Sequence, residues 1–153
     1  MITIKEGNLF DVKHGIIAHQ VNCWGVMGSG VAEQFKACFP TSYKWYRKKC
    51  NSVKTRADLL GKNINCYEDD EAIITVCMFA QENYGYNDCF TDYSAFRSCC
   101  KQLAYDINSL GREDETINMP YLIGCGRAGG DWNIVFNIIY EELNDFDVIL
   151  WRL

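Results

Sequence analysis

Hydrophobic residues along the chain form two kinds of pattern, which alternate and predict alternating strands and helices. Period-2 alternation, or a short apolar run bounded by turn residues, predicts a strand, whereas apolar residues spaced three and four positions apart predict a helix. The longest apolar run, residues 72–80, is typical of a strand buried on both faces. The predicted strands are residues 2–5, 16–21, 64–67, 72–80, 116–119 and 147–151.

Apolar positions between these strands predict four helices. They are marked by Val31, Phe35 and Cys38; by Tyr43, Trp45 and Tyr46; by Tyr93, Phe96, Cys100, Leu103 and Ile107; and by Trp132, Val135, Phe136, Ile139 and Leu143. Pro40 either closes the first helix or opens the second, Thr91 or Asp92 caps the third, and Asp131 caps the fourth. A turn is predicted at residues 69–71. Strands alternating with helices predict an α/β fold, a sheet covered by helices on both sides.

Length and composition favour a single domain that spans residues 1–153. The chain is 153 residues long and 48% hydrophobic, which suits one sizeable core, and it contains no repeat or linker-like tract. No signal peptide opens it and no apolar run reaches membrane-spanning length, so we expect no membrane partner. Nine cysteines without a CxxC pair, and only two histidines, predict reduced thiols in a cytoplasmic protein rather than a metal site.

The charge balance bears on the ligand class. The net charge of −5 argues against a nucleic-acid partner, because phosphate neutralisation needs a basic stripe. A local group of cations on the second helix (Lys44, Arg47, Lys48, Lys49) is interpreted as a solvated face. A small anionic ligand is still compatible with this charge, because backbone N–H groups bind phosphate without Lys or Arg.

Two glycine-rich segments carry the candidate chemistry. In residues 19–32, a strand ends at Asn22 and a loop with Gly28, Ser29 and Gly30 leads into a helix. Glycines allow close approach of the backbone to a ligand, and the helix N-terminus offers free N–H groups to phosphate. The alternative is a strand–turn–helix link that needs glycine for its geometry alone.

The second segment, residues 124–132, matches the pattern GxGxxG between a strand and a helix. We reject a dinucleotide-binding Rossmann fold, because that motif belongs to the first strand–helix unit and only one helix and one strand follow here. Two such loops at one edge of a parallel sheet can instead clamp one diphosphate.

Residues 19–32 and 124–132 together resemble the macro domain family, and residues 5–9 and 132–153 fit its first and last elements. The resemblance covers essentially the whole chain. It implies a three-layer α/β/α sandwich with a mixed central sheet and a cleft for ADP-ribose. The sequence looks closest to the branch of ADP-ribose 1''-phosphate phosphatases and phage proteins.

The resemblance also implies the site residues. Asn22 would bind the distal ribose, and Asn8, followed by Leu9, stands where many family members carry an aspartate for the adenine. Tyr84 and Tyr86 either stack on the adenine, cover the cleft or pack on the surface. The two loops that hold the distal ribose and the phosphates would be formed by Gly28, Ser29, Gly30 and Val31, and by Gly124, Cys125, Gly126, Arg127, Ala128 and Gly129.

Three residues are catalytic candidates: His19, Asn22 and Asp131. His19 aligns with a histidine implicated in catalysis in the yeast-type phosphatases. The alternative interpretation is a histidine at a strand end that is buried in the core. The alternative for Asp131 is a helix N-cap. Residues 80–84 contain no lysine and position 128 is Ala, which argues against the lysine-dependent branch that strips ADP-ribose from glutamate.

We therefore expect a monomeric enzyme that binds a small-molecule ADP-ribose derivative and hydrolyses ADP-ribose 1''-phosphate to ADP-ribose and phosphate. No cofactor and no metal are expected. Cys23 and Cys125 lie in the two loops and are interpreted as inert thiols. The alternatives are a non-catalytic reader of ADP-ribose and a de-ADP-ribosylating hydrolase that lacks the catalytic lysine.

Overall fold

The computed structural model describes residues 1–70 and 72–153; Glu71, in the predicted turn at residues 69–71, lies outside the described residues. The described residues form a six-stranded sheet in the order β1-β6-β5-β2-β4-β3. All neighbouring strands are parallel except β3 and β4, which are antiparallel, so the sheet is mixed. The strands are β1 (Ile2–Glu6), β2 (Gly15–Asn22), β3 (Asn63–Glu68), β4 (Ile73–Gln81), β5 (Ile117–Pro120) and β6 (Val148–Arg152).

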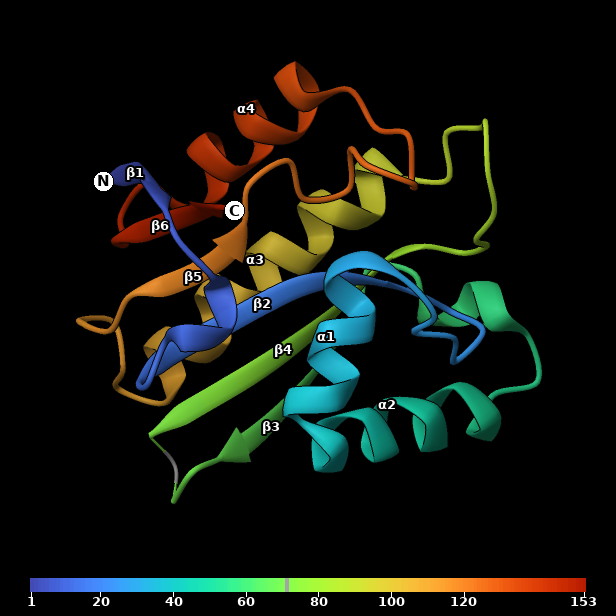
Figure 1. Cartoon of the computed structure of the whole chain (residues 1–153), viewed down its shortest axis with the longest axis horizontal. Helices are drawn as coiled ribbons and strands as arrows, with labels where there is room; N and C mark the ends of the chain where they lie inside the picture. Colours follow the sequence, from blue (N-terminus) through green and yellow to red (C-terminus); the bar gives the residue numbers. More distant parts are fainter. Residues whose placement is uncertain (71) are drawn as a thin grey trace.

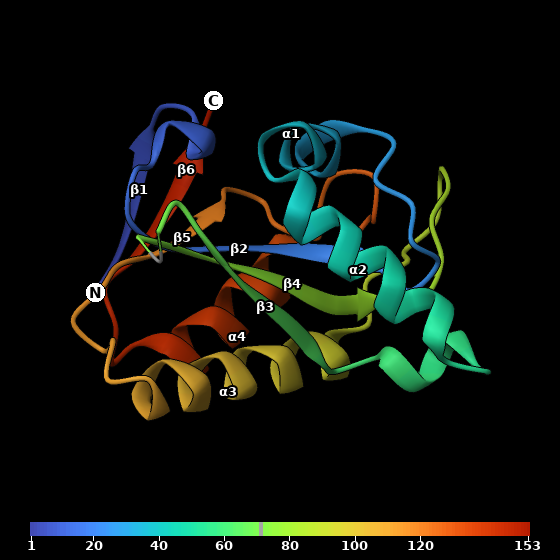
Figure 2. The same ribbon diagram turned by 90° about the horizontal axis from the view of Figure 1, so that it is seen from below.

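Helices cover both faces of this sheet, as Figure 2 shows from below. One face carries α1 (Gly30–Cys38) and α2 (Pro40–Ser52), and the other carries α3 (Tyr93–Ser109) and α4 (Trp132–Leu143). The expected three-layer α/β/α sandwich is thus confirmed. Two short 3-10 helices, η1 (Leu9–Asp11) and η2 (Arg56–Leu59), were not anticipated from the apolar pattern.

The central strands separate two hydrophobic cores. Along β2, Ile16 and Ala18 pack toward α3 and α4, whereas Ile17 and Val21 pack toward α1 and α2. Successive side chains of a strand point to opposite faces, so a strand buried on both faces needs an apolar residue at nearly every position. This explains the continuous apolar run that predicted β4.

Polar residues at the helix ends set where the helices begin. The Asp92 carboxylate accepts a hydrogen bond from Ala95 N at 2.9 Å, so Asp92 rather than Thr91 caps α3. Pro40 opens α2 instead of closing α1, because its fixed φ suits the first helical turn and its missing N–H costs nothing there.

None of the helices in the described residues is both long and apolar enough to cross a bilayer.

Candidate functional site

A cleft of about 700 Å³ is lined by residues at the carboxyl ends of β2, β4 and β5. The carboxyl ends of β2 and β4 point to the right in Figure 1. This edge of the sheet gathers segments that are far apart in sequence, as parallel strands require. The residues that line the cleft are His19, Gln20, Val21, Asn22, Val26, Gly28, Ser29, Gly30, Val31, Ala32, Gln81, Tyr84, Gly85, Tyr86, Pro120, Tyr121, Leu122, Ile123, Gly124, Gly126, Arg127 and Ala128.

Asn22 folds the first glycine loop with its side chain. Its Oδ1 accepts hydrogen bonds from Trp24 N at 3.0 Å and from the Tyr46 hydroxyl at 2.9 Å, and its Nδ2 donates to Val26 O at 2.8 Å. The side chain is buried, and within the described residues one hydrogen of its Nδ2 has no hydrogen-bond partner. Asn22 is therefore a structural centre of the loop as well as a residue of the cleft.

The first glycine loop ends at the N-terminus of α1, which borders the cleft. Ser29 stands at the N-cap position but its side chain makes no capping hydrogen bond. Gly30 adopts φ +60°, and a Cβ atom there would meet no heavy atom within 4 Å. The first turn of α1 thus presents backbone N–H groups and the positive end of the helix dipole at the cleft.

The second glycine loop is tied to the residues that precede α3. Ala128 O accepts from Phe90 N at 2.6 Å, and Gly124 O accepts from the Thr91 hydroxyl at 2.6 Å. A Cβ atom at Gly129, where φ is +72°, would collide with the backbone carbonyl of Asp88. The glycine at position 129 is thus required by the close approach of two backbones.

Gln20, which lines the cleft, connects β4 to the segment before α3. Its Nε2 donates to Gln81 Oε1 and to the Thr91 hydroxyl, both at 2.9 Å, while its Oε1 is buried without a hydrogen-bond partner in the described residues. Gln81 in turn donates to Asn83 O at 2.9 Å. Sequence reasoning missed the role of Gln20, although a polar residue near the end of a buried strand is a signal for it.

His19 lies at the floor of the cleft with only 1% of its surface exposed. Its ring stacks on Phe35 of α1 with centroids 4.0 Å apart, and its Nε2 lies 3.5 Å from Cys77 Sγ. Burial lowers the pKa of His19 from 6.5 to about 3. The imidazole is therefore neutral near pH 7, and its Nδ1 has no hydrogen-bond partner in the described residues.

Five residues that the sequence assigned to the site do not line the cleft in the described structure: Asn8, Leu9, Cys125, Gly129 and Asp131. Each of them caps a helix, packs in a core or shapes a loop instead. Asp131 caps α4 by accepting from Asn133 N at 2.9 Å, as its alternative interpretation anticipated. Asn8 caps η1 by accepting from Phe10 N at 3.0 Å, and Leu9 is buried. A ligand role for these residues stays a prediction.

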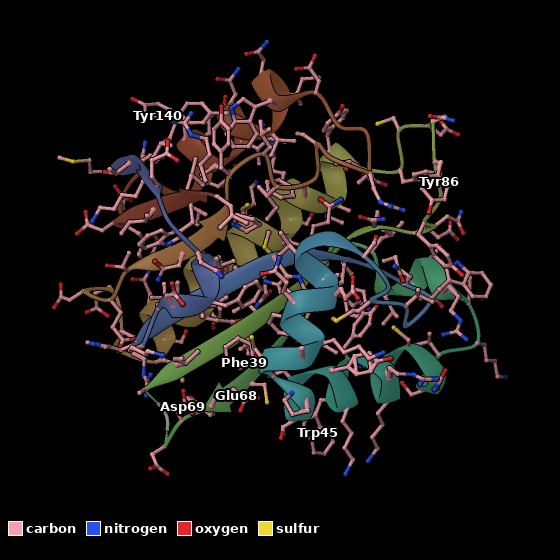
Figure 3. All side chains as sticks on the ribbon, in the orientation of Figure 1. Phe39, Trp45, Glu68, Asp69, Tyr86 and Tyr140 are labelled. Atoms are coloured by element: carbon pink, nitrogen blue, oxygen red, sulfur yellow. The ribbon has the colours of Figure 1, made fainter. Side chains whose placement is uncertain are left out.

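The charges of the cleft favour an anion. Among the lining residues described, Arg127 is the single Lys or Arg, and none is Asp or Glu. The Arg127 guanidinium lies 4.5 Å from the centroid of the Tyr86 ring. Figure 3 shows Tyr86 on the loop that rises at the rim of the molecule. One cation, glycine amides and a helix N-terminus make the cleft suited to phosphate.

Solved structures identify the architecture. The chain superimposes over its full length on the macrodomain of Mycobacterium tuberculosis DarG, with a TM-score of 0.82, 23% identity and 98% of that chain covered. A protein of Bacteroides thetaiotaomicron gives a TM-score of 0.84 at 24% identity, with both chains fully covered. The chain has the macrodomain fold. No protein-family model matches this chain.

Curated relatives match parts of the chain. An ADP-ribose 1''-phosphate phosphatase of Aspergillus clavatus is 33% identical over 73 residues, which cover 47% of this chain and 36% of the relative. Another ADP-ribose 1''-phosphate phosphatase, from Meyerozyma guilliermondii, is 33% identical over 94 residues. The match covers 52% of this chain and 53% of the relative. A DNA ADP-ribosyl glycohydrolase of Thermus aquaticus is 44% identical over 50 residues, 33% and 14% of the two chains. The chain thus spans about half or less of the length of the relatives it matches.

The thiols near the cleft are not activated. Burial is the largest cause that raises the pKa of Cys125 to about 11 and that of Cys23 to about 12. Both groups are therefore protonated near pH 7 and poor nucleophiles. Within the described residues, no three His, Cys, Asp or Glu side chains gather as a metal site would require.

The structure also adds lining residues that the sequence did not indicate. Tyr121 and Leu122 follow β5 directly and form part of the wall beside the second glycine loop. Leu122 has a positive φ of 63°, which is uncommon for a residue with a Cβ atom. No sequence signal marks these two residues, because a tyrosine and a leucine after a strand are equally compatible with a core.

Proposed function

We propose that this macrodomain binds an ADP-ribose derivative in the cleft. The observation that carries the proposal is that two glycine loops, the N-terminus of α1 and Arg127 surround one space, which no carboxylate of the described residues lines. A structural neighbour with bound ligand supports it. Thermosipho africanus DarTG, solved in complex with ADP-ribose, superimposes on 97% of this chain with a TM-score of 0.77 at 20% identity. The diphosphate would accept hydrogen bonds from the backbone N–H groups of the two loops.

The reaction we propose is hydrolysis of ADP-ribose 1''-phosphate. Water attacks phosphorus, the bond from phosphorus to the 1''-oxygen breaks, and the proton from water ends on the leaving oxygen or on the released phosphate. The names of the relatives from Aspergillus clavatus and Meyerozyma guilliermondii support this substrate. Since the lining residues that the structure describes include no carboxylate, positioning and backbone N–H donors would supply most of the rate enhancement.

His19 is the proposed proton acceptor, through Nδ1. Its neutral state in the free protein leaves this nitrogen able to accept, and a bound phosphate dianion nearby would raise the pKa of the imidazole. Asn22 and Asp131 then act through position: Asn22 holds the first loop, and Asp131 holds the start of α4.

The decisive experiment measures phosphate release from ADP-ribose 1''-phosphate, with ADP-ribose binding measured by calorimetry on the same sample. Release with turnover, lost in Gly30→Glu, supports the phosphatase. Binding without release contradicts the reaction and leaves a reader of ADP-ribose. Neither binding nor release contradicts the ligand as well. His19→Ala is expected to reduce turnover and spare binding, and unchanged turnover would remove His19 from the reaction.

A second candidate reaction is removal of ADP-ribose from nucleic acid. It is favoured by the Thermus aquaticus relative, whose name states that it is a DNA ADP-ribosyl glycohydrolase and which shares 44% identity with 50 residues here. The same assay distinguishes it when an ADP-ribosylated oligonucleotide replaces the phosphate ester. Release of free ADP-ribose with no release of phosphate from the ester would favour this reaction over the first.

A further inference from the structure

The charges of this chain are divided unevenly. Eight of the 15 Lys and Arg residues, but only one of the 20 Asp and Glu residues, lie in residues 36–62. This segment therefore has a formal charge of +7, and the remainder of the chain has −12. A net charge of −5 conceals this division, because it averages two regions of opposite sign.

Three cations of this segment are exposed on α2, namely Lys44, Arg47 and Lys48. Arg56 in η2 is half-buried and donates a hydrogen bond to Cys50 O at 2.6 Å. Within the part of the chain that the structure describes, none of these four side chains takes part in a salt bridge. Residues three and four apart lie side by side on a helix, so Lys44, Arg47 and Lys48 form one continuous row.

Two large aromatic side chains are exposed among the cations. Trp45 and Trp24 each leave 47% of their surface in solvent. The Lys48 ammonium lies 4.9 Å from the Trp45 ring, and the Arg56 guanidinium lies 5.0 Å from the Trp24 ring. Figure 3 shows Trp45 on the outer side of α2, directed away from the sheet. Each tryptophan is thus partly exposed and has a positive charge adjacent to its ring.

Trp24 connects this surface to the wall of the cleft. Its indole Nε1 donates to Asn83 Oδ1 at 2.8 Å, which fixes the ring against the segment that continues into Tyr84 at the cleft. Gly25, the next residue, packs beside the Arg47 side chain of α2. The six residues Trp24, Lys44, Trp45, Arg47, Lys48 and Arg56, called here the basic face, therefore extend from α2 to the outer rim of the cleft.

We propose that the basic face docks single-stranded nucleic acid. Backbone phosphates would contact the four cations, and unpaired bases would stack on Trp24 and Trp45, the combination that binds single strands with little sequence preference. A membrane surface is less suited, because Trp45 is the one large hydrophobic side chain exposed on α2 in the described structure. An acidic peptide would use the cations but leave both tryptophans without a stacking partner. The inference does not depend on the reaction in the cleft.

The test is fluorescence anisotropy of a labelled 15-nucleotide oligo-dT with the whole chain at 50 mM salt. We expect binding that weakens with salt, and affinity about 10-fold or more lower in Lys44→Glu/Lys48→Glu, because two attractive phosphate interactions become repulsive. The slope of log Kd against log salt should fall by about 1.4, about 0.7 for each phosphate that the variant no longer neutralises. The matched control, Lys13→Glu/Lys101→Glu, makes the same charge change at exposed lysines outside the basic face and should bind within about 2-fold of the unaltered chain.

A second pair of measurements tests stacking. Trp45→Ala should weaken oligo-dT binding about 5-fold or more, the effect typical of removing one stacked base. Polyglutamate at equal charge should fail to displace the oligonucleotide. Absence of binding at 50 mM salt, an equal weakening in the control variant, or displacement by polyglutamate would each overturn the proposal. ADP-ribose calorimetry on the same variants should be unchanged, which separates this surface from the function of the cleft.

Discussion

The Thr91 hydroxyl donates a hydrogen bond to the Gly124 carbonyl oxygen at 2.6 Å, and so joins the residue before the α3 cap to the second glycine loop. The same hydroxyl accepts from Gln20 Nε2 at 2.9 Å. Three segments that are distant in sequence thus meet at one buried oxygen atom. The position of the proposed phosphate loop therefore depends on a residue that contributes nothing to the cleft lining itself.

Thr91→Val is expected to loosen this loop. The substitution keeps the side-chain shape but leaves Gly124 O and Gln20 Nε2 each without one partner, which should lower the free energy of unfolding by about 1–3 kcal/mol. Denaturant unfolding measures the stability, and calorimetry should report weaker ADP-ribose binding. Thr91→Ser retains the hydroxyl and should recover most of the affinity. Equal behaviour of the Val and Ser variants would show that the hydrogen bond does not hold the loop.

Gly30→Glu should abolish ADP-ribose binding while the chain stays folded. The new side chain would start in open space at the cleft and place a carboxylate where an anion is proposed to bind. Gly111→Glu is a matched control, since Gly111 also has a positive φ of 68° and open space around it but does not line the cleft. Both variants should be destabilised by about 1 kcal/mol or more through backbone strain. Comparable affinity in the two variants would contradict the proposed ligand position.

Thiol labelling separates the exposed cysteines from those of the glycine loops. Cys38 and Cys89 are exposed, whereas the pKa of Cys125 is raised to about 11 and that of Cys23 to about 12. At pH 8 we expect Cys38 and Cys89 to be modified first, and Cys23 and Cys125 to react about 100-fold more slowly, since little of their thiolate is present. Peptide mapping after brief alkylation identifies the sites. Rapid labelling of Cys125 would contradict its interpretation as an inert thiol.

The apolar pattern was sufficient for the order of the elements but not for the arrangement of the sheet. Residues 72–80 predicted β4 because both of its faces are buried, and the structure places that strand at Ile73–Gln81. Strand neighbours depend on contacts between residues far apart in the chain, such as β1 with β6. The mixed sheet was therefore implied by the family resemblance rather than by periodicity.

The candidate site was only partly readable for a related reason. Glycine loops have a local signature, and Gly28, Gly30, Gly124 and Gly126 all line the cleft. The direction of a side chain depends instead on the strand register. His19 and Gln20 are adjacent in β2, yet the His19 ring packs against α1, whereas Gln20 contacts Thr91 near the start of α3.

The burial of His19 predicts a dependence of stability on pH. Its pKa is about 3 in the folded chain, compared with the ordinary value of 6.5 that applies to the unfolded chain. Below pH 6.5 the unfolded chain therefore binds a proton that the folded chain excludes. The stabilising contribution is therefore complete above pH 6.5 and is lost as the pH falls toward 3, with a limiting slope of about 1.4 kcal/mol per pH unit. Denaturant unfolding between pH 7.5 and 5.5 measures it before most carboxylates titrate.

His19→Gln supplies the decisive comparison. Glutamine does not titrate. Between pH 7.5 and 5.5 the free energy of unfolding of the His19→Gln variant should therefore change by about 1 kcal/mol less than that of the unaltered chain. His14→Gln, which alters the second of the two histidines at an exposed position, should keep the full dependence. If His14→Gln removes the slope and His19→Gln preserves it, His19 is accessible to protons in the folded chain.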